Sequence, residues 1–108
     1  MKRFEDQLFY SLVESGDVIS KTEVIPKDET WQISKFIGSA AYDPKSRVCL
    51  VWGHGSSEPQ LIRSTHGDVE HNLHFECVGD GAKALAIVLT NNSNETRSLG
   101  GGFEARVI

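Results

Sequence analysis

The sequence has little of what small proteins use as covalent or metal staples. Its 108 residues include only two cysteines, three prolines and one methionine. A chain of this length can bury a sufficient core without such staples. Cys49 and Cys77 both lie in apolar segments, and no export signal precedes them. We therefore expect two buried free thiols, with a disulfide between them as the alternative.

Long hydrophobic runs are also missing. No segment approaches the roughly 18 consecutive apolar residues of a transmembrane helix, so we predict no membrane association. The N-terminus, MKRFEDQLFY, has carboxylates at Glu5 and Asp6 where a secretory signal peptide has an apolar segment. These features predict a cytoplasmic protein.

Clustered positive charge is absent as well. Eleven scattered Lys and Arg residues stand against fifteen Asp and Glu, which gives a formal net charge of −4. Proteins that bind nucleic acids neutralise phosphates with clustered basic side chains. The charge pattern thus predicts no nucleic-acid partner.

What the sequence does contain is a series of short β-strands. Turn residues recur every 8–12 residues, and no convincing helix lies between them. Near Ile37 and Gly38 the alternation slips, which predicts a β-bulge. Residues 1–108 should form one all-β domain, an antiparallel, jelly-roll-like β-sandwich of about eight strands. The expected strands include residues 17–26, 30–42, 46–53, 60–65, 72–78, 83–91 and 96–108.

Two segments have no obvious role within such a sandwich. Residues 4–14 fit a helix by the spacing of their apolar residues, but we predict a strand because the rest of the chain is β. Three glycines inside the last strand predict a bulge or a close approach of another backbone. Both segments are candidates for a contact between subunits, although the first could equally dock on its own domain. The candidate interface residues are Phe4, Leu8, Phe9, Leu12, Gly100, Gly101 and Gly102.

A histidine cluster invites a metal-binding interpretation. His66, His71 and His74 lie within nine residues of one another, and imidazoles bind transition metals. On a strand, however, residues three apart point to opposite faces, so His74 should face outward with Glu76, away from His71. We predict no metal and no cofactor. A cupin-like metal enzyme that uses the three histidines is an alternative.

Aromatic residues offer a second alternative. Trp31, Tyr42 and Trp52 could form a stacking platform for a sugar, with His54 supplying a hydrogen bond, as in a carbohydrate-binding, lectin-like module. Both tryptophans begin or end apolar strands and are more typical of a core. Ser64, His66 and Asp68 share one turn and cannot form a catalytic triad, which needs separate elements. We predict that the chain is not an enzyme.

Three segments carry a resemblance: VCLVWGHG (48–55), GDGAKALAIVLTNNSN (79–94) and LGGGFEARVI (99–108). With the order of the elements, they resemble small jelly-roll or β-sandwich proteins encoded among the virion and prophage genes of bacterial viruses. The resemblance implies a non-catalytic structural or accessory subunit. Such a subunit would form a homo-oligomer or join a larger protein assembly, and would be virion-associated if phage-derived. It assigns no catalytic or binding residue.

Overall fold

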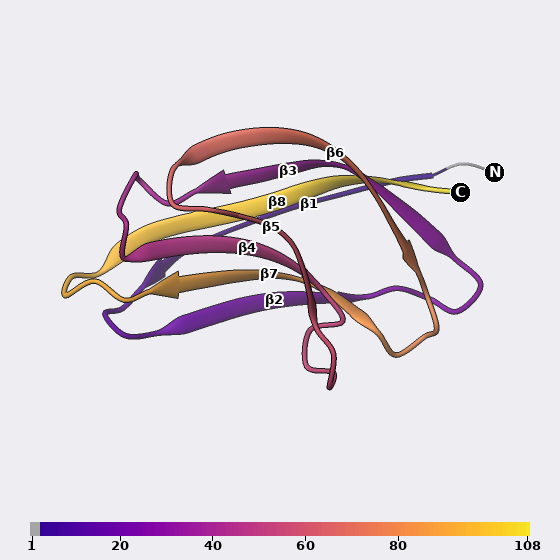
Figure 1. Ribbon diagram of the computed structural model, residues 1–108, viewed down its shortest axis with the longest axis horizontal. Coiled ribbons are helices and arrows are strands. Elements are labelled where there is room, and N and C mark those ends of the chain that lie inside the picture. Colours follow the sequence, from indigo (N-terminus) through magenta and orange to yellow (C-terminus); the bar gives the residue numbers. More distant parts are fainter. Residues whose placement is uncertain (1–2) are drawn as a thin grey trace.

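The computed structural model describes residues 3–108 as two packed β-sheets without a helix (Figure 1). All strand pairs are antiparallel, and the sheet orders are β1-β8-β3-β6 and β2-β7-β4-β5. This is the double-sheet arrangement of a jelly roll, and the predicted all-β sandwich is confirmed. The strands are β1 (Arg3–Val13), β2 (Val18–Val24), β3 (Thr30–Ser39), β4 (Ser46–Trp52), β5 (Gln60–Thr65), β6 (Asp68–Val78), β7 (Ala84–Asn91) and β8 (Arg97–Val107).

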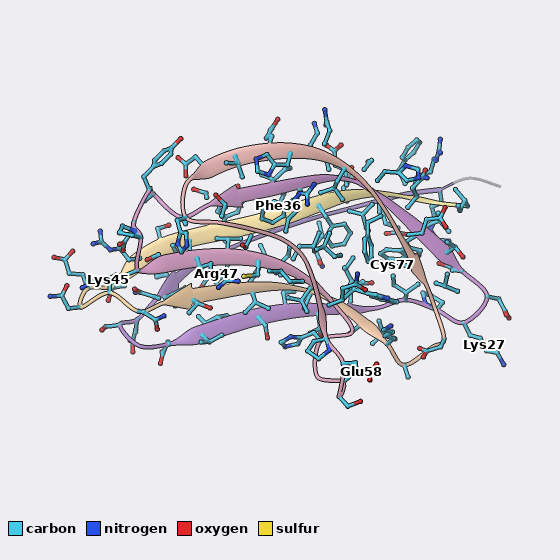
Figure 2. The ribbon with its side chains drawn as sticks, in the orientation of Figure 1. Lys27, Phe36, Lys45, Arg47, Glu58 and Cys77 are labelled. Carbon is cyan, nitrogen blue, oxygen red and sulfur yellow. The ribbon has the colours of Figure 1, made fainter. Side chains whose placement is uncertain are left out.

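Alternate residues of the central strands fill the space between the sheets. In β7, Leu85, Ile87 and Leu89 are fully buried, and they face Phe36 and Phe103 of the other sheet within one core cluster. Figure 2 shows Phe36 and Cys77 pointing into this layer, whereas Lys27 and Glu58 extend from turns into solvent. The period of two along each strand therefore separates core from surface.

The N-terminal segment is a strand, as predicted, and the helical alternative is wrong. β1 pairs with β8 over its whole length, from Arg3 opposite Val107 to Val13 opposite Arg97, without a register shift. Arg3 donates hydrogen bonds to the carboxylates of Glu5 and Glu29, which holds the start of the strand. The first and last strands of the chain thus lie side by side.

The predicted bulge exists, but not where the sequence placed it. The register of β3 shifts between Ile33 and Lys35, where the hydroxyl of Ser34 donates to the carbonyl oxygen of Glu104. Gly38 stays in the ladder opposite Gly101. A Cβ at Gly38 would lie 2.5 Å from Cγ2 of Thr65. The glycine is therefore needed for close side-chain packing and does not mark a bulge.

Asn91 organises a buried polar network where β7 ends. Its Nδ2 donates to the carbonyl oxygens of Val13 and Glu95, both at 2.8 Å. Its Oδ1 accepts from the backbone N–H of Ser93 at 2.9 Å, and the Ser93 hydroxyl lies 2.6 Å away. Asn91 is fully buried. One side chain therefore ties the end of β1 to the β7–β8 turn.

A carboxylate in the β3–β4 turn makes stability depend on pH. Asp43 accepts hydrogen bonds from the backbone N–H of Lys45 and the hydroxyl of Ser46, and it pairs with Arg97 of β8 at 3.2 Å. These contacts, first of all the Lys45 N–H, lower the pKa of Asp43 below its ordinary value of 3.8. A lowered folded-state pKa adds stability at pH values above the unfolded pKa, and this stability is lost as pH falls through the folded-state pKa.

We expect Asp43→Asn to be less stable than the parent protein at neutral pH, with a difference that shrinks as the pH falls below 3.8 and through the lowered folded-state pKa of Asp43. Urea unfolding at a series of pH values measures it. Glu58→Gln is the control, because the Glu58 side chain has no hydrogen-bond partner in the described part of the chain and extends into solvent. A difference for Asp43→Asn that stays constant with pH would contradict the expectation.

Candidate functional site

An apolar stripe runs along the outer face of β1. Phe4, Leu8, Tyr10 and Leu12 are 75%, 60%, 55% and 70% exposed, and Asp6 is the one charged residue between them. We call these four residues the β1 stripe. All lie at even positions, so the period of two turns them away from the core. Large apolar side chains grouped on one strand indicate a contact surface more strongly than scattered ones do.

The stripe explains why residues 100 and 102 of β8 are glycines. Leu8 and Tyr10 lie opposite Gly102 and Gly100 in the ladder. A Cβ at Gly100 would collide with the Tyr10 ring, and one at Gly102 would collide with the Gln7 carbonyl oxygen and Leu8. Because β1 and β8 stay in register, the glycines allow close approach and do not create a bulge.

Gly101 points the other way, into the core. A Cβ there would lie 2.6 Å from Cγ1 of Val48 and 3.0 Å from Cγ2 of Ile87. Phe9 also faces inward and packs against the core cluster. Both residues were expected at a subunit interface, and their placement inside the sandwich corrects that expectation. Phe4, Leu8 and Leu12 do lie on the surface.

Tyr10 is the member of the stripe that the predicted interface lacked. Strict alternation from Leu8 to Leu12 would have found it. Its ring borders a shallow hollow of about 370 Å³ on the outer face of the same sheet, which Ile37, Ser39, Asp68 and Glu70 also line. The stripe is therefore continuous with a recessed surface across β8 and β3.

The strand that carries the stripe also lies at the edge of its sheet. Among residues 3–108, β1 pairs with β8 alone, so its other side is a free edge. Proteins protect such edges with short strands, charges or irregular register. β2 and β5 have seven and six residues, and β6 carries exposed Asp68, Glu70 and Glu76 and an irregular register. β1 has eleven residues, a regular register and an apolar outer face.

The three clustered histidines do not converge. His71 lies opposite Phe36 on the inner side of β6, with ring centroids 6.5 Å apart, whereas His74 contacts Gln32 on the outer side. The Nδ1 of His66 lies 2.5 Å from the carbonyl oxygen of Ser46. Within residues 3–108, no three His, Cys, Asp or Glu side chains could together hold a metal ion. The structure thus gives the cupin-like alternative no ligand set.

The aromatic residues do not form a sugar platform either. Trp31 and Trp52 are 2% and 5% exposed. The Trp31 indole donates to Glu29, and the Lys83 ammonium lies 4.8 Å from the Trp52 ring centroid. Tyr42 is exposed in the turn that follows β3, at the opposite end of that strand from Trp31. His54 lines a hollow with Asp80 and Lys83 next to Trp52, away from Tyr42.

Both cysteines are unpaired and buried, on different sheets. Burial raises the pKa of the Cys77 thiol to about 12 and also raises that of Cys49. Both thiols are therefore protonated at neutral pH and react slowly.

No protein-family model matches the chain, and no curated protein matches it significantly. Among residues 3–108, no helix is long and apolar enough to cross a membrane. The β1 stripe is the largest group of exposed apolar side chains on any one strand of residues 3–108.

Proposed function

We propose that the chain is a non-catalytic structural or assembly subunit that associates with copies of itself. The observation that carries this proposal is the β1 stripe, four exposed apolar side chains on an unpaired edge strand. Burying such side chains contributes about 25 cal/mol for each Å² of apolar surface removed from water. A free edge adds main-chain hydrogen bonds to that contribution. A contact between subunits through β1 buries the apolar side chains and also pairs the free main-chain groups of the edge.

The resemblance to jelly-roll proteins of bacterial viruses agrees with this role. Many virus capsids are built from jelly-roll domains. Most soluble oligomers are symmetric assemblies of identical chains. We propose that the subunit acts in the cytoplasm, or on the virion if it is phage-derived. A lectin-like function is less well supported, because Trp31 and Trp52 are both buried.

We expect the purified protein to be an oligomer by light scattering. We expect Leu8→Lys to raise the dissociation constant of this oligomer at least about tenfold. The reason is that an ammonium buried in an apolar contact costs at least the 1.4 kcal/mol of a tenfold change. Dilution series followed by sedimentation velocity measure the dissociation constants. The proposal is overturned if the parent protein is a monomer at high concentration.

Leu61→Lys is the matched control. Leu61 is 50% exposed on β5, an edge strand of the other sheet, so it tests the same substitution away from the stripe. It should leave the oligomer unchanged. Equal effects of the two substitutions would mean that association does not depend on β1. Urea unfolding of both variants shows whether either change acts through the fold.

A further inference from the structure

We propose that the partner is a second copy of this chain, paired antiparallel along β1 with Leu8 on a two-fold axis. The two four-stranded sheets then form one continuous eight-stranded sheet across the contact. This inference rests on the proposed self-association and adds its geometry. A strand of eleven residues supplies an edge about 36 Å long for such pairing.

About Leu8, the outward residues of β1 set apolar side chains opposite apolar ones, and Asp6 opposite Tyr10 is the exception. With Leu8 on the axis, Phe4 lies opposite the partner's Leu12, and Leu8 lies opposite the partner's Leu8. Asp6 lies opposite the partner's Tyr10, whose hydroxyl can donate to the carboxylate once the ring turns from its place over Gly100 towards the edge. Each apolar side chain of the stripe that meets another apolar one gains a cross-strand contact. Leu8 is also the middle residue of the strand, so all of β1 is paired.

The inward residues fit the same register. Arg3 lies opposite the partner's Val13, Glu5 opposite the partner's Ser11, and Gln7 opposite the partner's Phe9. No two like charges oppose each other. Arg3 and Glu5 already pair within one chain, so neither needs a charged partner from the other copy.

In other registers, Asp6 faces an unfavourable residue of the partner. Moving the axis to Gln7 or Phe9 sets the Asp6 carboxylate opposite the partner's Leu8 or Leu12, so it receives no hydrogen bond from the residue that it faces and lies against an apolar side chain. Moving the axis to Asp6 sets two like charges against each other, which is destabilising. A slip of the partner by one residue would set outward side chains against inward ones. The position of Asp6 therefore selects Leu8 as the axis.

A disulfide tests this register directly. Residues directly opposite each other in antiparallel strands have Cα atoms about 4.5–5.5 Å apart, within the range that a disulfide spans. We expect Leu8→Cys to form a covalent dimer under mild oxidation, at least about tenfold faster than Phe4→Cys alone or Leu12→Cys alone. An equal mixture of Phe4→Cys and Leu12→Cys, once exchanged, should crosslink at about half the initial rate of Leu8→Cys, because about half of its dimers combine the two variants. The parent protein is the baseline, because Cys49 and Cys77 are buried.

The outcomes separate this inference from the function that it rests on. Rapid crosslinking of Leu8→Cys and of the mixture supports the two-fold register. An oligomer in which Leu8→Cys crosslinks no faster than Phe4→Cys alone overturns the register and leaves self-association standing. A parent protein that is monomeric at every concentration overturns both. Rapid crosslinking of Phe4→Cys alone would place Phe4 opposite its own copy, as in parallel pairing or in antiparallel pairing about Phe4, and would also overturn the register.

Discussion

Replacing Asn91 by alanine is expected to lower the free energy of unfolding by about 3–4 kcal/mol, because each buried polar group left without a partner costs about 1–3 kcal/mol. The substitution removes the donor to the carbonyl oxygens of Val13 and Glu95 and the acceptor for the N–H of Ser93. It also leaves a void in a fully buried position. Urea unfolding followed by tryptophan emission measures the loss, since Trp31 and Trp52 are both buried in the folded protein.

The neighbouring residue is the control for this change. Asn92 is exposed, and its backbone N–H, which alanine retains, donates to the carbonyl oxygen of Lys45. Asn92→Ala should change the free energy of unfolding by less than about 0.5 kcal/mol, as for most surface substitutions. Similar losses for the two variants would show that the buried network does not stabilise the fold as described.

Replacing Gly102 by valine should cost about 3 kcal/mol or more, because the new side chain collides with main chain as well as with a movable side chain. A Cβ at this position meets the carbonyl oxygen of Gln7 in β1. The strain is relieved only if β1 moves away from β8. We therefore expect faster proteolytic cleavage within residues 3–13, together with a lower urea midpoint.

Ser98→Val separates this collision from the effect of a larger side chain in β8. Ser98 is exposed on the same strand, opposite Leu12, and valine favours a strand. This variant should match or slightly exceed the stability of the parent protein. If Gly102→Val were as stable as Ser98→Val, the close approach of β1 to the glycines would be refuted.

The strands themselves were largely predictable from local pattern. Alternating or continuous apolar residues between regularly spaced turns located β3, β4 and β7 within a few residues. The bulge was misplaced because a glycine in a strand signals either an irregular register or close packing. Only the contact of Thr65 with Gly38, which joins segments far apart in the sequence, distinguishes the two.

Which side chains of β1 face outward was partly predictable from the sequence. That β1 is an edge strand was not. The period of two separates Leu8 and Leu12 from Phe9 once residues 4–14 are taken as a strand, but the helical spacing of Phe4, Leu8 and Leu12 obscured this. That β1 is an edge follows from its pairing with β8 alone. Sheet order depends on contacts between residues distant in sequence, which composition and local pattern do not encode. The inward direction of Gly101 was unpredictable for the same reason, because it follows from the pairing of Gly101 with Phe9.

The pairing of the first strand with the last also sets the order of events during synthesis. Arg3 lies opposite Val107, so β1 pairs with β8 only after about a hundred further residues have emerged from the ribosome. Until then, its apolar residues and both of its edges face solvent. Such late closure of long-range β pairs slows folding and exposes a nascent chain to aggregation. β1 is made before the other seven described strands but is one of the last to be placed, and a chain stopped before β8 has no strand with which to pair it.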